Sequence, residues 1–214
     1  MHGAGQGGRE AWPQQDPADA VFADHSTHAR MTDKAATVAE QCPPGDVVVV
    51  AHSLGAVAVA LAFVAGDIPA SHVILVEPAL YDIARGHDAV EGHIGPISEA
   101  RDRAFRDDLF GYWEIVGPLM FGRPAARETW AQDREVAVRL ACLEPPWGHG
   151  VDAAVFADVP TLVVTGGWNE EYEAIASRLV DEGAEHVRLP DTRHRPQDHP
   201  AFEAEVSAFR RTNE

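Results

Sequence analysis

The chain has 214 residues, of which 45% are hydrophobic and 24% charged, so it is long enough for one globular domain with a core and a small insertion. Its formal net charge of −17 repels phosphate backbones and anionic membranes, which argues against binding to nucleic acid or to a membrane. The two cysteines, Cys42 and Cys142, form no CxxC pattern, so neither a zinc site nor a disulfide framework is expected. The first residues, MHGAGQGGRE, lack the apolar core of a secretory signal, and a cytoplasmic location is expected.

The first half of the chain predicts strands and a helix in alternation. AVFADH (20–25) resembles a strand, and VVVVA (47–51) is a wholly apolar strand of the kind covered on both faces in a parallel sheet. LGAVAVALAFVAG (54–66) predicts a helix that Gly66 ends, and HVILVEPA (72–79) predicts another buried strand. The polar residues His52 and Ser53 interrupt the long apolar stretch, so a buried strand and helix explain it better than a membrane span.

The last third of the chain continues the alternation. PTLVVTGG (160–167) predicts a strand, EEYEAIASRLVDEGA (170–184) a helix, HVRLPD (186–191) a short strand and FEAEVSAFRR (202–211) a closing amphipathic helix. Alternating strands and helices of this kind predict a doubly wound α/β fold with a mostly parallel sheet.

Residues 80–155 do not alternate and are rich in aromatic and helix-forming residues. Phe105, Leu109 and Trp113 fall at i, i+4 and i+8, which predicts one apolar stripe on a helix. We therefore predict a core domain made of residues 1–79 and 156–214, with residues 80–155 as a helical insertion.

Ser53 stands where an apolar strand meets an apolar helix. A sharp turn at this point lifts the serine hydroxyl above the sheet edge and requires small neighbours, here Ala51 and Gly55. The N–H of Leu54 at the helix start would then face a developing negative charge. A serine that merely caps the helix is the alternative.

AHSLGA resembles the nucleophile elbow of the α/β-hydrolase superfamily, with alanine in place of the first glycine of G-x-S-x-G. HGAGQGG (2–8) is similar to the oxyanion loop of that family, and the resemblance implies oxyanion donors at the N–H groups of Ala4, or Gly5, and of Leu54. LPDTRHRPQDHP places His194 where the family has its general base, with His199 as a rival in the same loop.

The resemblance implies a carboxylate partner for the histidine and leaves two positions for it. The position after the strand at 160–165 is occupied by Asn169, which is neutral, and Glu170 beside it is the alternative acid. The other position is Glu77, which ends the apolar run VILVE. Glu77 is favoured over Glu170, although it could instead form a structural ion pair with a loop arginine.

The insertion resembles the helical cap of the family, and Trp113, Phe121 and Trp147 could line an apolar substrate pocket or belong to the core of the cap itself. The histidine pairs in HSTHAR (25–30), HDAVEGH (87–93) and HRPQDHP (194–200) match no metal motif, so neither a metal nor another cofactor is expected. The substrate implied is a small apolar ester or a related carbonyl compound.

The resemblance implies a serine hydrolase that works through an acyl-enzyme, with Ser53, His194 and Glu77 as its catalytic set. C–C bond hydrolysis on the same scaffold and a non-catalytic module that binds a small ligand are the alternatives. About three family strands that precede the HG loop have no counterpart here. A start site assigned too far downstream is favoured over a genuine N-terminally truncated fragment, and the chain is expected to have a weakened edge near residues 1–30 and impaired catalysis.

Overall fold

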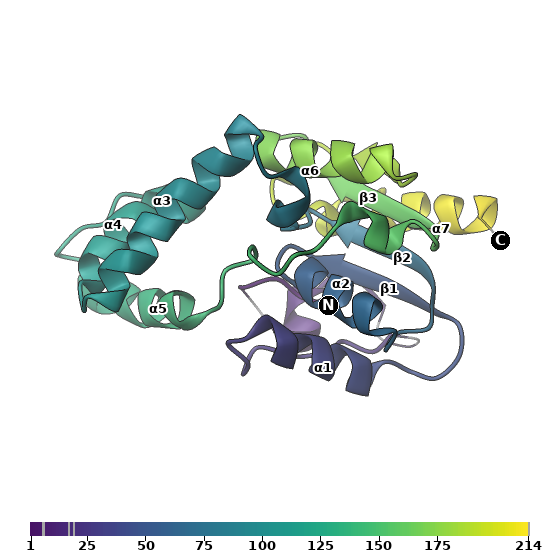
Figure 1. Cartoon of the computed structure of the whole chain (residues 1–214), viewed down its shortest axis with the longest axis horizontal. Coiled ribbons are helices and arrows are strands. Elements are labelled where there is room, and N and C mark those ends of the chain that lie inside the picture. Colours follow the sequence, from purple (N-terminus) through teal and green to yellow (C-terminus); the bar gives the residue numbers. More distant parts are fainter. Residues whose placement is uncertain (6, 17, 19, 214) are drawn as a thin grey trace. The chain divides into compact units, whose positions relative to one another are not determined.

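The computed structural model describes residues 1–5, 7–16, 18 and 20–213, and these form two compact units (Figure 1). One unit consists of Met1–Arg85 and Pro145–Glu214, and the other of Gly86–Glu144. The second unit is wholly helical and lies within residues 80–155 of the sequence. The role of that segment as a cap stays a prediction.

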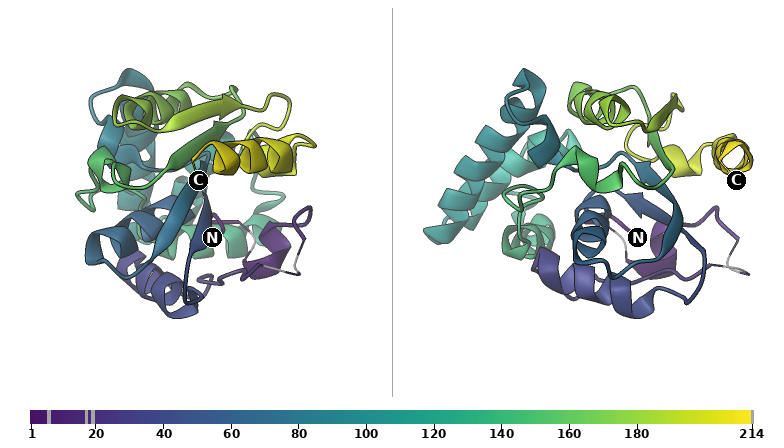
Figure 2. Two further views of the ribbon diagram at one scale, coloured as in Figure 1. Left: turned by 90° about the vertical axis from the view of Figure 1, so that its right-hand side faces the viewer. Right: turned by 45° about the vertical axis from the view of Figure 1, so that its right-hand side comes forward.

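A parallel sheet forms the centre of the first unit. Its strands follow the chain order β1-β2-β3-β4, with bounds β1 (Val47–His52), β2 (Ala70–Val76), β3 (Thr161–Thr165) and β4 (Glu185–Arg188). Ala51 pairs with Leu75, and Val76 pairs with Val164, so the carboxyl ends of β1, β2 and β3 meet at one edge. Helices flank the sheet, and the predicted doubly wound α/β class is confirmed (Figures 1 and 2).

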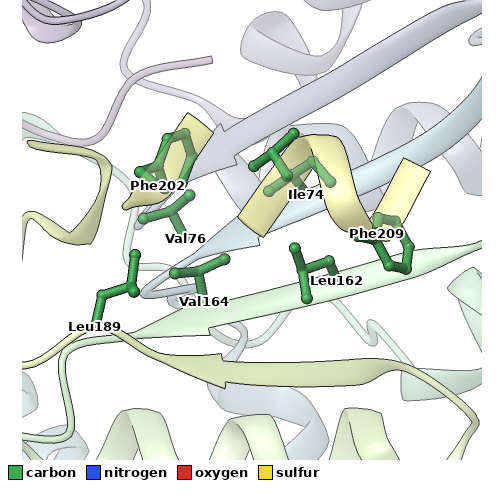
Figure 3. Packing of buried hydrophobic residues seen from close by; sticks show 8 residues of the cluster. Ile74, Val76, Leu162, Val164, Leu189, Phe202 and Phe209 are labelled. Atoms are coloured by element: carbon green, nitrogen blue, oxygen red, sulfur yellow. The ribbon is translucent and has the colours of Figure 1, made fainter. Parts of the chain in front are cut away.

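The helices of this unit lie on both faces of the sheet (Figure 2). They are α1 (Met31–Gln41), α2 (Gly55–Ala65), α6 (Glu170–Asp181) and α7 (Phe202–Thr212), with the short 3-10 helices η1 (Gly8–Ala11), η2 (Tyr81–Ala84), η3 (Ala153–Phe156) and η4 (Pro196–Asp198). α7 places Phe202 and Phe209 against alternate residues of β2 and β3, as Figure 3 shows. Burying one such phenylalanine stabilises the fold by about 1.5–3 kcal/mol.

The edge of the sheet at β1 differs from the prediction. Val47–Val50 are only half-buried, because β1 is the outermost strand among the described residues. The predicted strand at 20–25 does not form. The carboxylate of Asp24 accepts the N–H of Ser26 (2.9 Å), and this local turn competes with strand pairing. Beside β1, Met1 continues the ladder: its amine donates to Val50 O (2.7 Å), and its carbonyl accepts from His52 N (3.1 Å).

The helical unit contains α3 (Asp88–Phe105), α4 (Leu109–Phe121) and α5 (Trp130–Cys142). The predicted stripe of Phe105, Leu109 and Trp113 is wrong, because the chain turns between α3 and α4 at Asp107, where φ is +65°. Phe105 is 92% exposed, whereas Trp113 is buried. Within the described residues, no helix has the length and apolar character needed to cross a membrane.

Candidate active site

Ser53 lies at a tight turn between β1 and α2. Its φ of +53° is left-handed, which is a strained conformation for a residue with a side chain. The turn is fixed from both sides, because Ser53 N donates to Val76 O (2.9 Å) and Ser53 O accepts from Ala79 N (3.1 Å). Leu54 is the N-cap of α2, and no side chain caps this helix. The structure therefore places Ser53 at the apex of an elbow and not in a capping position.

The small residues around the elbow are required by the chain segment that crosses it. A Cβ atom on Gly55 would lie 2.6 Å from the carbonyl oxygen of His2, and one on Gly3 would lie 3.0 Å from the Cβ of Ser53. The segment that contains Ala4 thus runs directly beside the serine. Among the described residues, the N–H groups of Ala4 and Leu54 donate no hydrogen bond, so both remain available as donors.

A histidine cluster supports this segment. The rings of His2 and His25 stack at 3.8 Å, and His25 Nε2 donates to His2 O (3.0 Å). Lys34 is buried and lies against His25 from the other side, with Nζ 3.2 Å from His25 Nδ1. Burial lowers the pKa of His25 to about 3, so this ring is neutral at pH 7. His28, its partner in the HSTHAR pair, takes no part in these contacts.

Glu77 ends β2 in a second left-handed conformation, with φ of +42°, and its side chain is fully buried. Three donors satisfy its carboxylate: Gly166 N (2.6 Å), Trp168 Nε1 (3.0 Å) and His194 Nδ1 (3.3 Å). A buried carboxylate needs such partners to remain ionised. The titratable side chain that contacts Glu77 within the described part of the chain is therefore His194, and not the loop arginine considered as an alternative.

His194 lies in the loop between β4 and η4, and its side chain is 36% exposed. Since a carboxylate can only accept, His194 Nδ1 carries the hydrogen and Nε2 is left with a free lone pair. His52 fixes the backbone of this loop by donating from Nε2 to His194 O (2.8 Å). Burial, followed by the nearby His194 ring, lowers the pKa of His52 well below its usual value.

The other sequence candidates occupy different places. Asn169 caps α6 through its side chain, which accepts from Glu171 N (3.0 Å), and Glu170 is exposed in the first turn of that helix. His199 accepts the N–H of Ala201 at its Nδ1 (3.1 Å). Among the hydrogen bonds and ion pairs of the described residues, none joins Glu170 or His199 to His194 or Glu77.

Aromatic residues that the sequence analysis did not single out as site residues surround His194. The ring of Tyr172 lies 5.1 Å from the imidazole at 31°, and Trp168 meets it edge-on at 6.3 Å. The expected pocket residues belong to different units: Trp147 packs on Tyr81 in the first unit, and Trp113 and Phe121 pack on each other inside the helical unit.

Ser53, Glu77 and His194 follow strands β1, β2 and β4 of one sheet, within a single compact unit. A model of the alpha/beta hydrolase family matches residues 2–206. The chain belongs to the alpha/beta hydrolase family. Membership of this family gives hydrolysis as its general class of activity.

Solved structures of alpha/beta hydrolase relatives share the fold of this family member. A carboxylesterase from the thaumarchaeon Nitrososphaera gargenis matches with a TM-score of 0.53 at 14% identity, over 100% of this chain and 89% of the other. The hydrolase olei00960 from Oleispira antarctica matches with a TM-score of 0.54 at 12% identity, over 85% of this chain and 72% of the other. MenH from S. aureus matches with a TM-score of 0.51 at 16% identity, over 93% of this chain and 79% of the other. No curated protein matches the chain.

Proposed function

We propose that this family member is a serine hydrolase that cleaves small apolar esters, or ester-like bonds, through an acyl-enzyme. The observation that carries the proposal is the contact between His194 Nδ1 and the buried Glu77 carboxylate, in the same unit as a serine held in a strained turn. Such a contact fixes the imidazole tautomer and stabilises the imidazolium that forms during proton transfer.

In the proposed reaction, Ser53 Oγ attacks the carbonyl carbon of the ester while His194 Nε2 takes the hydroxyl proton. The carbonyl oxygen becomes an oxyanion, which the N–H groups of Leu54 and Ala4 stabilise. His194 then gives the proton to the alcohol as the C–O bond breaks, leaving an acyl group on Ser53. A water molecule, deprotonated by His194, hydrolyses the acyl-enzyme and restores the serine.

The preference for an apolar substrate is supported by the aromatic surroundings of His194. Trp168 is 47% exposed although its indole N–H is bonded to Glu77, so an apolar ring face is available beside the imidazole. Tyr172 is buried on another side of the same ring. Aromatic walls around a few polar groups are typical of sites for small apolar ligands.

Labelling with a fluorophosphonate probe tests the proposal, because the probe reacts covalently with an activated serine. We expect mass spectrometry to find the probe on Ser53, and expect p-nitrophenyl acetate to be hydrolysed. The variant Ser53→Ala should lose both signals, whereas Ser177→Ala, which removes an exposed hydroxyl on α6, should keep both. A folded protein that resists the probe and does not hydrolyse the ester would contradict the proposal and favour a binding module.

A further inference from the structure

The loop between β3 and α6, residues 166–169, holds both oxygens of the Glu77 carboxylate. Gly166 N donates to Oε1 at 2.6 Å, and Trp168 Nε1 donates to Oε2 at 3.0 Å. His194 Nδ1 donates to the same Oε2 at 3.3 Å. The indole of Trp168 and the imidazole of His194 therefore share one carboxylate oxygen, and the Glu77 side chain that carries it is fully buried.

Contacts on both sides of Trp168 fix the backbone of this loop. A Cβ atom on Gly166 would collide with the carbonyl oxygen of Arg193, so the loop packs directly against the segment that carries His194. On the other side, Asn169 caps α6 through its side chain. Because the backbone is fixed before and after Trp168, the direction in which its indole N–H can point is limited.

Trp168 combines an exposed ring with a buried polar contact. Its side chain is 47% exposed, whereas the carboxylate that accepts its N–H is fully buried. A tryptophan that serves only the core is usually buried. Its ring neighbours are Tyr172, at 6.2 Å between centroids, and His194, at 6.3 Å. The position of Trp168 is therefore better explained by its hydrogen bond to Glu77 than by burial of apolar area.

We propose that Trp168 is a positioning residue, whose indole N–H fixes the Glu77 oxygen that orients His194. Donors on both oxygens, Gly166 N on one and Trp168 Nε1 on the other, prevent the carboxylate from rotating, so Oε2 stays directed at Nδ1. Hydrogen bonds of this kind also favour the ionised carboxylate, which is the form that stabilises an imidazolium. This inference rests on the proposed function of Ser53, Glu77 and His194.

The variant Trp168→Phe tests the proposal, because it keeps an aromatic ring and removes the indole donor. The kcat for p-nitrophenyl acetate is expected to fall about 10- to 100-fold, the factor that one hydrogen bond to a charged group corresponds to, while KM changes little. A residue that only lined the substrate pocket would instead raise KM and leave kcat unchanged. A folded Trp168→Phe protein with the wild-type kcat would overturn the proposal.

Repeating the substitution in the Glu77→Gln background separates an effect through the acid from damage elsewhere. If Trp168 acts through the carboxylate, Trp168→Phe should lower kcat much less when Glu77→Gln is already present than it does in the wild type. Equal falls of kcat in the two backgrounds would overturn the proposal. The matched control is Trp130→Phe, which removes a half-buried indole from the helical unit and should leave kcat unchanged.

The contact can also be measured without activity, through the indole N–H signals of the five tryptophans in a ¹H–¹⁵N NMR spectrum. The signal that is missing from Trp168→Phe belongs to Trp168, and this signal is expected to shift in Glu77→Gln. A Trp168 signal that stays in place in Glu77→Gln would overturn the proposal.

The two proposals fail in different ways. If the wild type resists the fluorophosphonate probe and does not hydrolyse the ester, the serine hydrolase is refuted, whatever the indole signal does. If the wild type reacts and Trp168→Phe keeps the wild-type kcat, only the positioning role of Trp168 is refuted.

Discussion

Acidification from pH 7 to pH 5 should destabilise the first unit through His25. This ring is fully buried, and its pKa is lowered to about 3, whereas an unfolded histidine has a pKa of about 6.5. Below the unfolded pKa, the unfolded chain binds a proton that the folded chain does not, so stability falls as the pH falls from about 6.5 towards 3. Linkage over the interval from pH 7 to pH 5 gives a loss of about 2 kcal/mol from this one group. This loss of unfolding free energy would change little for any pKa of folded His25 below about 4.

Urea unfolding of wild type and His25→Gln at both pH values isolates this contribution, because all other titrating groups are common to the two proteins. The wild type should lose about 2 kcal/mol more than the variant between pH 7 and pH 5. His28→Gln removes a histidine from the same segment, keeps the buried one, and should behave as the wild type. An NMR titration of the histidine rings checks the cause directly. Equal losses in wild type and His25→Gln, or a His25 ring that titrates near pH 6.5, would refute the reasoning.

Three further predictions concern the elbow and the candidate acid. Glu77→Gln should slow ester hydrolysis by more than 100-fold, on the order of the loss seen when a triad acid is made neutral. Glu170→Gln should leave the rate unchanged. Comparing the kcat of the two variants decides between the two acids, and a large loss of kcat in Glu170→Gln would reverse the assignment. Gly55→Ala should destabilise the protein by about 1–3 kcal/mol in urea unfolding, because the new Cβ would lie 2.6 Å from His2 O; unchanged stability would mean that the HG segment does not cross the elbow. Asn169→Ala should cost about 1 kcal/mol through loss of the α6 cap and leave serine labelling intact, and loss of labelling without unfolding would speak for a catalytic role.

The fold class could be predicted from the sequence because each central element has a simple pattern. The valine run of β1 and the alanine-rich α2 are continuously apolar, and α7 has one apolar face. Each forms within a few residues of its predicted bounds. The strand at 20–25 was predicted wrongly, since pattern alone does not weigh the turn made by Asp24. Helix α1 was missed because its buried face includes the polar residues Lys34 and Thr37, so the sequence shows no apolar stripe there.

The candidate site likewise contains residues whose positions could be predicted from the sequence and residues whose positions could not. Ser53, Glu77 and His194 stand at strand ends or in a loop next to recognisable motifs, so their positions could be predicted, while their catalytic roles stay a prediction. Tyr172 and Tyr81 carry no such signal. They are ordinary positions of α6 and η2 in the sequence, and only the fold brings the Tyr172 ring beside His194 and the Tyr81 hydroxyl to Glu171. The cluster of His2, His25 and Lys34 likewise depends on a contact across more than twenty residues.

The two left-handed residues at the ends of β1 and β2 set a limit on how stable this protein can become. Each side chain in that conformation costs on the order of 1 kcal/mol that glycine would not. Glycine would relieve this strain at position 53 but would discard the hydroxyl of the proposed nucleophile. At position 77 it would also leave the three donors of the Glu77 carboxylate without their acceptor. At Ser53, backbone strain is thus tied to the proposed chemistry, so stabilising substitutions in this protein have to be sought elsewhere in the chain.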